Sequence, residues 1–371
     1  MAEPYPFDPA AREADARPRR MLREPPGTSG RRRATIRTTA AGRPRGPPPT
    51  ARRPTAEDEN EVEVDEMRRI LLWMARDPAL RERLPRLRFV RRATRRFMPG
   101  ETVEDALRAA DALIADGQGI LFTRLGENLI ALAEADAVAA HYHDVIDSGR
   151  TRSRSIEVSV KPTQLGLDID AEATYRHCVG LARHAAEAGT WLWLDMESSP
   201  YVDPTIELYE RLRADHENVG ICLQAYLRRT PADLQRLLAM APAVRLVKGA
   251  YDEPAVLAYR RKADVDASYQ TLAVTLALAA RDRRARLGLG THDVDLIRRI
   301  GTFAEAAGVP RSKLEVHMLY GIRAPELRRL QREGYPAFTL VAYGTAWYPW
   351  YMRRLAERPA NVLFALRQVL P

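Results

Sequence analysis

Short apolar runs alternate with longer stretches of helical spacing along most of the chain. The longer stretches, such as DPTIELYERLRAD and DVDLIRRIGTFAEAAG, repeat apolar residues at the intervals of an amphipathic helix. Strands that alternate with helices form βαβ units and a parallel sheet. The predicted strands are GILFTRL, SIEVSV, WLWLDM, VGICLQ, VRLVKG, RLGLGTHD, LEVHML and FTLVAYG.

Eight such units over roughly 250 residues predict a closed (β/α)8 barrel of the TIM type. The rival α/β architecture is an open doubly wound sheet, but no GxGxxG sequence follows the first strand. Helical patterns precede the barrel from about residue 60. In one of them, ETVEDALRAADALIADG, residues Glu101, Thr102 and Glu104 mark a helix start.

Residues 1–60 differ from the rest in composition and have no hydrophobic periodicity. Residues 1–56 hold 13 arginines, five acidic residues and 11 of the 26 prolines, so they carry +8 of the net charge of +9. Such a segment cannot bury a core, and we predict a disordered Arg/Pro-rich tail followed by one domain over residues 61–371. Because that domain is nearly neutral, no nucleic-acid partner is expected. The tail itself either binds an acidic partner or is an inert extension.

The sequence has no signal-peptide h-region and no apolar run long enough to span a bilayer. Cys178 and Cys222 are its two cysteines. Two isolated cysteines indicate a reduced, cytoplasmic chain rather than a disulfide framework.

Polar side chains stand where the predicted strands end. In barrels the carboxyl ends of the strands surround the active site, whereas the other end serves stability. A ring of polar strand ends therefore predicts an enzyme. The ring comprises Arg124, Glu127, Lys161, Asp195, Glu197, Gln224, Lys248, Thr291, His292, His317 and Tyr343.

Lysine is rare, with four lysines among the 58 basic residues. Lys161 and Lys248 each close a strand, where a lysine can be a Schiff-base nucleophile or a compact charge for a bound anion. A lysine paired with a loop acid is the third interpretation.

Asp195 and Glu197 are two residues apart, so on a strand they would point the same way. They could be a general acid and base or metal ligands, but no HxH or HExxH sequence completes a metal site, and we predict no metal. His292 is either structural or catalytic.

The segment YGTAWYPWYMRRLAERP predicts a last helix with two adjacent arginines. Arg353 and Arg354 diverge by about 100° around a helix and cannot share one face. Arg353 with Glu357 would be an ordinary surface pair. Arginines among aromatic residues at a barrel mouth instead suit a bidentate carboxylate clamp.

Together these stretches resemble the proline dehydrogenase family, specifically its single-function bacterial type. The resemblance implies an FAD enzyme on a distorted (β/α)8 barrel. Such an enzyme oxidises L-proline to Δ1-pyrroline-5-carboxylate and passes the electrons to a membrane quinone. A cytoplasmic protein, peripheral on the inner face of the membrane, is implied as well. The matching stretches are SVKPTQLGLD, WLDMESSP, LQAYLRRT, VRLVKGAYDEP, THD, MLYGI and YGTAWYPWYMRRLAERPANVLFALR.

The resemblance also implies roles for individual residues. The substrate carboxylate would be bound by Lys161, Arg353 and Arg354. Asp195 and Arg245 would be the catalytic residues beside substrate and flavin. Glu127 resembles an acid that pairs with an arginine to gate the site. The residues implied in FAD binding are Met196, Gln224, Lys248, Gly249, Ala250, Thr291 and His292.

Three positions depart from the family pattern. Leu340 and Trp350 each replace a tyrosine, and His317 replaces a glutamine. We therefore expect an intact cofactor site and a reshaped substrate pocket that favours a cyclic imino acid with an apolar substituent. Two alternatives stay open: a lysine-dependent Schiff-base lyase on the same barrel, and a non-catalytic homologue that binds flavin or another ligand. The sequence predicts no oligomeric state.

Overall fold

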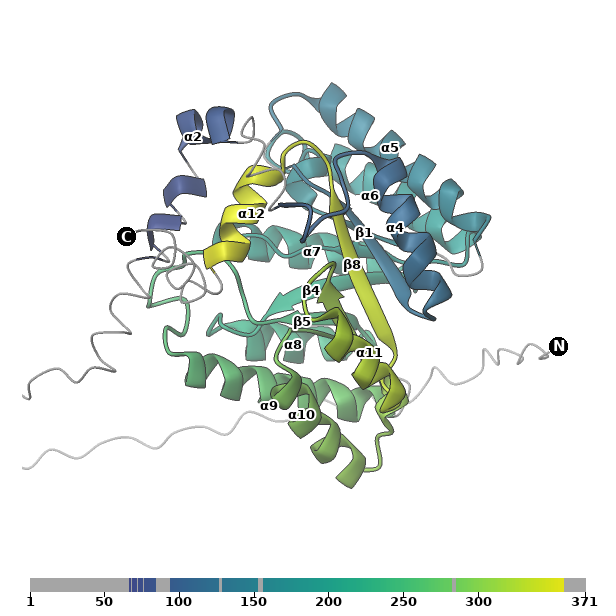
Figure 1. Ribbon diagram of the computed structural model, residues 1–371, viewed down its shortest axis with the longest axis vertical. Helices are drawn as coiled ribbons and strands as arrows, with labels where there is room; N and C mark the ends of the chain where they lie inside the picture. Colours follow the sequence, from purple (N-terminus) through teal and green to yellow (C-terminus); the bar gives the residue numbers. More distant parts are fainter. Residues whose placement is uncertain are drawn as a thin grey trace, which may run out of the picture. The chain divides into compact units, whose positions relative to one another are not determined.

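The computed structural model describes residues 67–356, except 68, 72, 76, 85–93, 127–128, 153–155 and 282–284. The predicted tail lies outside the described residues. Eight parallel strands close into a barrel in chain order, with β8 paired to β1, which confirms the predicted architecture (Figure 1). The strands are β1 (Gly119–Arg124), β2 (Ile156–Val160), β3 (Leu192–Leu194), β4 (Val219–Gln224), β5 (Ala243–Val247), β6 (Arg286–Gly290), β7 (Leu314–Leu319) and β8 (Ala337–Tyr343).

Helices surround the barrel (Figure 1). Thr102 is the N-cap of α4, as predicted, and its hydroxyl accepts from the backbone N–H of Asp105 at 3.2 Å. The helices are α2 (Pro78–Arg83), α4 (Val103–Ala115), α5 (Leu132–Arg150), α6 (Ala171–Glu187), α7 (Val202–Arg213), α8 (Thr230–Leu238), α9 (Lys262–Arg281), α10 (Val294–Ala306), α11 (Ala324–Arg332) and α12 (Trp347–Ala356). Within the described ranges, 3-10 turns form η2 (Pro162–Leu165), η3 (Ser199–Tyr201) and η4 (Arg311–Lys313).

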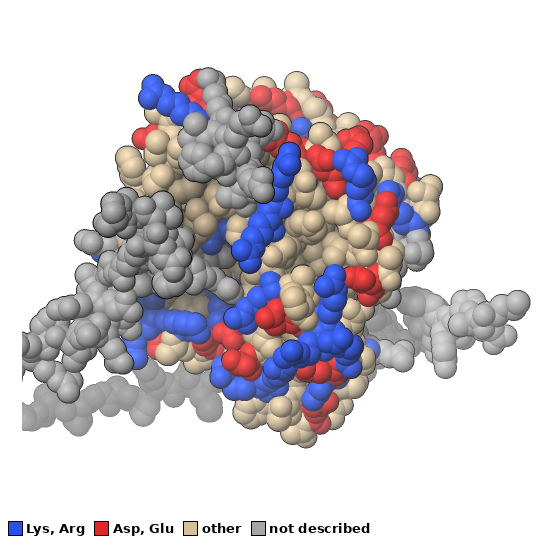
Figure 2. Space-filling view, in the orientation of Figure 1, with Lys and Arg blue, Asp and Glu red and all other residues tan. Residues whose placement is uncertain are grey.

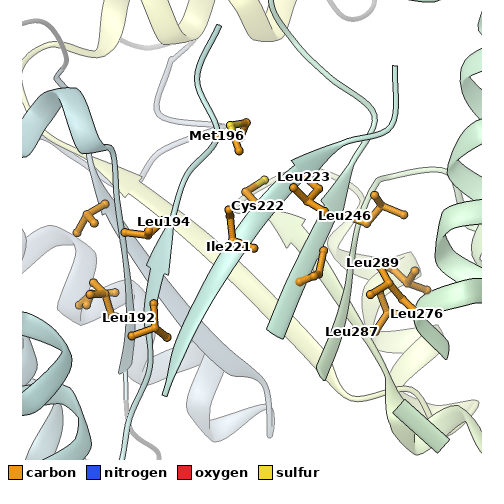
Figure 3. Close-up of a cluster of buried hydrophobic side chains, with 14 of the residues drawn as sticks. Leu192, Leu194, Met196, Ile221, Cys222, Leu223, Leu246, Leu276, Leu287 and Leu289 are labelled. Carbon is orange, nitrogen blue, oxygen red and sulfur yellow. The ribbon is translucent and has the colours of Figure 1, made fainter. Parts of the chain in front are cut away.

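The main core lies between the outer face of the barrel and the helices. Leu276 of α9 lies beside Leu287 and Leu289 of β6, and all three belong to one buried cluster (Figure 3). Burying each such side chain contributes about 1.5–3 kcal/mol. Cys178 and Cys222 are buried and free.

The inside of the barrel holds charged as well as apolar side chains. One small apolar cluster, Leu121, Trp193 and Ala243, occupies it. The charged side chains of Glu157 and Arg245 point inward from β2 and β5 and are buried. Charged groups in a barrel interior require partners, and those partners define the candidate site.

Helix α12 packs against the carboxyl end of the barrel. Its buried aromatic residues form a second cluster with Leu125, which follows β1, and with Ala342 of β8. On the face seen in Figure 2, basic side chains lie beside acidic ones, in keeping with a nearly neutral domain. No helix within the described ranges is long and apolar enough to cross a membrane.

Candidate active site

Three side chains, one from β2, one from β5 and one from the residue after β3, meet near the carboxyl end of the barrel. The Ser159 hydroxyl donates to Asp195 Oδ1 at 2.9 Å, and Arg245 Nη2 donates to Ser159 Oγ at 2.8 Å. Arg245 Nη2 also donates to Asp195 Oδ1. The sequence pointed to Asp195 and Arg245 but missed Ser159. The alternation in EVSVK could have found it, because Ser159 shares its strand face with Lys161.

Arg245 is almost completely buried, and its charge is balanced locally. Burial alone would lower the pKa of its guanidinium, but Asp195, together with the weaker effects of Cys222 and Glu157, outweighs burial, and the pKa is raised. Nη1 of the same guanidinium is buried and has no hydrogen-bond partner among the described residues. Arg245 is therefore permanently charged, and its Nη1 can donate a hydrogen bond to a ligand.

Gln224, at the end of β4, supplies the matching acceptor. Its Nε2 donates to the carbonyl oxygens of Met196 and Glu197, both at 3.3 Å. Its buried Oε1 has no partner within the described part of the chain. A buried acceptor and a buried donor near one barrel mouth fit a ligand with both kinds of group on one edge.

Asp195 and Glu197 are held by different partners, so the expected carboxylate pair is wrong. β3 ends at Leu194, and strand alternation no longer applies beyond it. Glu197 accepts from the backbone N–H of Thr163 at 3.1 Å and from its hydroxyl at 2.7 Å. Glu197 thus anchors η2. Among the described residues no group of three His, Cys, Asp or Glu side chains could hold a metal ion.

Lys248 follows β5 and turns towards α9 and α10. Its Nζ lies 2.6 Å from Asp266 Oδ1 and 2.8 Å from Asp293 Oδ2. This ammonium is occupied and is not available as a Schiff-base nucleophile. The next residue, Gly249, has φ +121°, and a Cβ there would lie 2.1 Å from the Tyr226 ring. Only glycine fits this position.

Thr291 and His292 link β6 to α10. The buried Thr291 hydroxyl accepts from the backbone N–H of Asp293 at 3.2 Å. Asp293 in turn caps α10 through the N–H of Leu296 at 3.1 Å. Thr291 thereby holds the helix cap in place, and the half-buried His292 lies between the two residues in sequence.

The three residues expected to bind a carboxylate lie on η2 and α12. Lys161 is the N-cap of η2 and is 8% exposed, and no described carboxylate lies within ion-pair distance of its ammonium. Arg353 and Arg354 are partly buried and contact different rings. Their Cζ atoms lie 5.6 Å from the Tyr251 ring and 6.0 Å from the Trp350 ring. Two separate ring contacts agree with the predicted divergence of adjacent helix residues. Glu357, the proposed partner of Arg353, lies outside the described residues.

Two members of the predicted ring do not face the barrel mouth. His317 lies within β7, not at its end, and its Nε2 is 3.0 Å from Glu315 Oε2 in the barrel interior. Tyr343 is directed to α5, with its hydroxyl 2.8 Å from His141 Nε2. Successive side chains of a strand point to opposite faces of the sheet, and this alternation sets the direction of both side chains. Glu127, the expected gating acid, lies outside the described residues.

Comparisons with known proteins agree with this geometry. A family model described as proline dehydrogenase matches residues 106–367. Proline dehydrogenase 1 of Bacillus subtilis is 32% identical over 304 residues, which cover 82% of this chain and 99% of the relative. Proline dehydrogenase of Deinococcus radiodurans is 33% identical over 313 residues, covering 83% and 99%. The structure of proline utilization A (PutA) from Bdellovibrio bacteriovorus has the same fold, with a TM-score of 0.68 and 22% identity. The similarity covers 80% of this chain and 37% of that one.

Proposed function

The chain belongs to the proline dehydrogenase family, a family of oxidoreductases, and we propose that it oxidises L-proline or a related cyclic imino acid with FAD. The observation that carries the proposal is the pair of buried, unpartnered atoms at the barrel mouth, Arg245 Nη1 and Gln224 Oε1. The pyrimidine edge of a flavin carries carbonyl acceptors and an N–H donor, so it can satisfy both atoms. The residues present therefore fit a flavin.

A bound flavin supplies the electron chemistry, and the protein binds, orients and excludes water. We assign the substrate carboxylate to Lys161, Arg353 and Arg354. The absence of a described acid beside Lys161 supports this assignment. Three cations around one carboxylate also favour loss of the proton on the ring amine. Asp195 accepts a hydrogen bond from Arg245 Nη2 and balances the charge of the guanidinium.

The remaining cofactor contacts are assigned to the segments after β3, β5 and β6. Gly249 supports this, because the lack of a side chain lets the backbone approach a ligand closely. We also propose that a membrane quinone accepts the electrons. The assigned residues are Met196, Lys248, Gly249, Ala250, Thr291 and His292.

The test is a spectroscopic titration of the purified protein. It should display the visible absorption of oxidised flavin, and anaerobic L-proline should bleach it and yield the cyclic imine. A soluble quinone analogue should restore the colour. A colourless protein, or a yellow one that no cyclic imino acid bleaches, would contradict the proposal. Borohydride trapping of a lysine adduct would support the lyase interpretation instead.

Leu340 is the residue from which we predict an altered substrate preference. It is partly exposed on β8 and packs against Leu121, Trp193 and Ala243 inside the barrel. We expect 4-methylproline to have a higher kcat/KM relative to proline than it has after Leu340→Tyr. Proline should remain a substrate, since one mismatched methylene costs about 1–3 kcal/mol. The assay compares proline, 4-hydroxyproline, 4-methylproline and pipecolate. A profile dominated by proline in both proteins refutes the prediction.

A further inference from the structure

Trp193 lies in the barrel interior, where the absence of a side chain on Gly220 leaves room for its indole. It is fully buried on β3 and pairs with Gly220 of β4. A Cβ on Gly220 would lie 2.4 Å from the indole Cε3. Gly288 of β6 makes similar room for His317. The centroid of the His317 ring lies 5.9 Å from the centroid of the indole, in an edge-to-face arrangement. Such close packing leaves the indole one position.

The orientation of the indole is also fixed by a charged network. Trp193 Nε1 donates to Glu157 Oε2 at 2.6 Å. Arg286 donates to Glu157 Oε1 at 2.7 Å and to Glu315 Oε1 at 2.9 Å, and its Cζ lies 5.0 Å from the Trp193 ring. A guanidinium shared by two carboxylates has little rotational freedom. The network therefore holds the acceptor of the indole N–H in place.

Arg245 rests on the same indole. Its Cζ lies 5.6 Å from the Trp193 ring. Its hydrogen bonds to Ser159 and Asp195 both leave from Nη2. Bonds from a single nitrogen let the guanidinium turn about that atom, which would change the direction of Nη1. Packing on the indole removes this freedom.

We propose that Trp193 is a positioning residue of the active site: held by Glu157, it fixes the direction in which Arg245 presents Nη1 to the bound flavin. The inference rests on the proposed function. A cation aimed at the pyrimidine edge stabilises charge that develops there, and this effect depends on geometry set before the reaction. If the Arg245 guanidinium turns, it keeps its charge, but Nη1 no longer points at the pyrimidine edge.

The test compares Trp193→Phe with a matched control, Trp191→Phe. Trp191 stacks on Trp193 at 6.2 Å and lies 4.5 Å from Arg286 Cζ, but among the described contacts Arg245 lies over Trp193 alone. In Trp193→Phe we expect kcat for proline to fall about tenfold to a hundredfold, the loss typical of a misplaced electrostatic donor. The KM should stay within about threefold, because Lys161 and α12 bind the carboxylate. The reduction potential of the bound flavin should become more negative.

Trp191→Phe should keep the wild-type kcat, KM and potential, while its melting temperature falls as much as that of Trp193→Phe. A wild-type kcat and potential in Trp193→Phe, or an equal kcat loss in Trp191→Phe, would overturn the proposal. If Trp193→Phe does not bind flavin, the variant Glu157→Gln tests the proposal instead. This substitution keeps the side-chain volume but removes the charge-assisted hydrogen bond to the indole, so kcat should fall about threefold or more at constant KM. An unchanged kcat there also overturns the proposal.

These results separate the inference from the proposed function. A wild-type protein that does not oxidise proline counts against the function. The flavin potential of Trp193→Phe, measured against that of Trp191→Phe, still decides the positioning role.

Discussion

Lys161 and Lys248 both follow a barrel strand, yet their surroundings differ. Lys248 has two carboxylate partners, whereas Lys161 has none among the described residues. We predict that Lys161→Met raises the KM for proline and leaves flavin bound. A charge-assisted bond to a buried carboxylate contributes about 1.5–3 kcal/mol, or roughly tenfold to a hundredfold in KM. Steady-state kinetics and flavin absorbance measure this. Lys313→Met, on η4 at the opposite end of the barrel, is the control. An unchanged KM in Lys161→Met would place the anion site elsewhere.

His317 should make the stability of the protein depend on pH. Burial lowers its pKa to about 4, and the nearby Glu315 only partly offsets this. An unfolded histidine has a pKa of about 6.5. Between these values the unfolded chain binds the extra proton, so the free energy of unfolding decreases as the pH falls from about 6.5 towards about 4. At about pH 5 the loss is about 2 kcal/mol.

His317→Gln should abolish this loss, because glutamine can donate to Glu315 and does not titrate. Denaturant unfolding at several pH values gives the measurement. His216→Gln, after α7, serves as the control substitution. Equal slopes in the wild type and His317→Gln would contradict the prediction.

The sequence predicts several candidate site residues because strand ends and alternation are local properties. The motifs predicted Asp195 and Arg245 as site residues, and the structure joins the two by a hydrogen bond. Ser159 was missed, since its bond to Arg245 joins residues 86 positions apart. The sequence pattern predicts Trp193 only as part of an apolar strand, although its N–H belongs to a charged network. Contacts between distant strands depend on barrel register, and apolar periodicity does not encode which polar atoms meet.

At the scale of elements, Asp293 joins β5, α9 and α10. Burial raises the pKa of its carboxyl, but hydrogen bonds from Lys248 and from the backbone of Leu296 outweigh burial, and the pKa falls to about 2. An unfolded aspartate has a pKa of about 3.9. The stabilisation is therefore present above about pH 4 and is lost as the pH falls towards about 2.

Asp293→Asn should lower the free energy of unfolding at neutral pH by about 1 kcal/mol, after allowance for solvent screening. Asparagine caps helices as well as aspartate does, so the loss reports the ion pairs with Lys248 and Lys262. Asp295→Asn, exposed in the first turn of α10, is the control. The difference from wild type should shrink as the pH falls from about 4. If the stability loss in Asp293→Asn stayed constant as the pH fell below about 4, the loss would come from the helix cap of α10 and not from the ion pairs.

The net charge and the family match occupy different parts of the chain. Residues 1–56 carry +8 of the net charge of +9 and lie outside residues 106–367, which match the family model. The Bacillus subtilis relative is matched over 99% of its length by 82% of this chain. We predict that removal of residues 1–60 leaves the melting temperature and the flavin content unchanged, because their composition cannot bury a core. Thermal melting and flavin per chain provide the measurement. A clear loss of either would mean that these residues pack on the barrel.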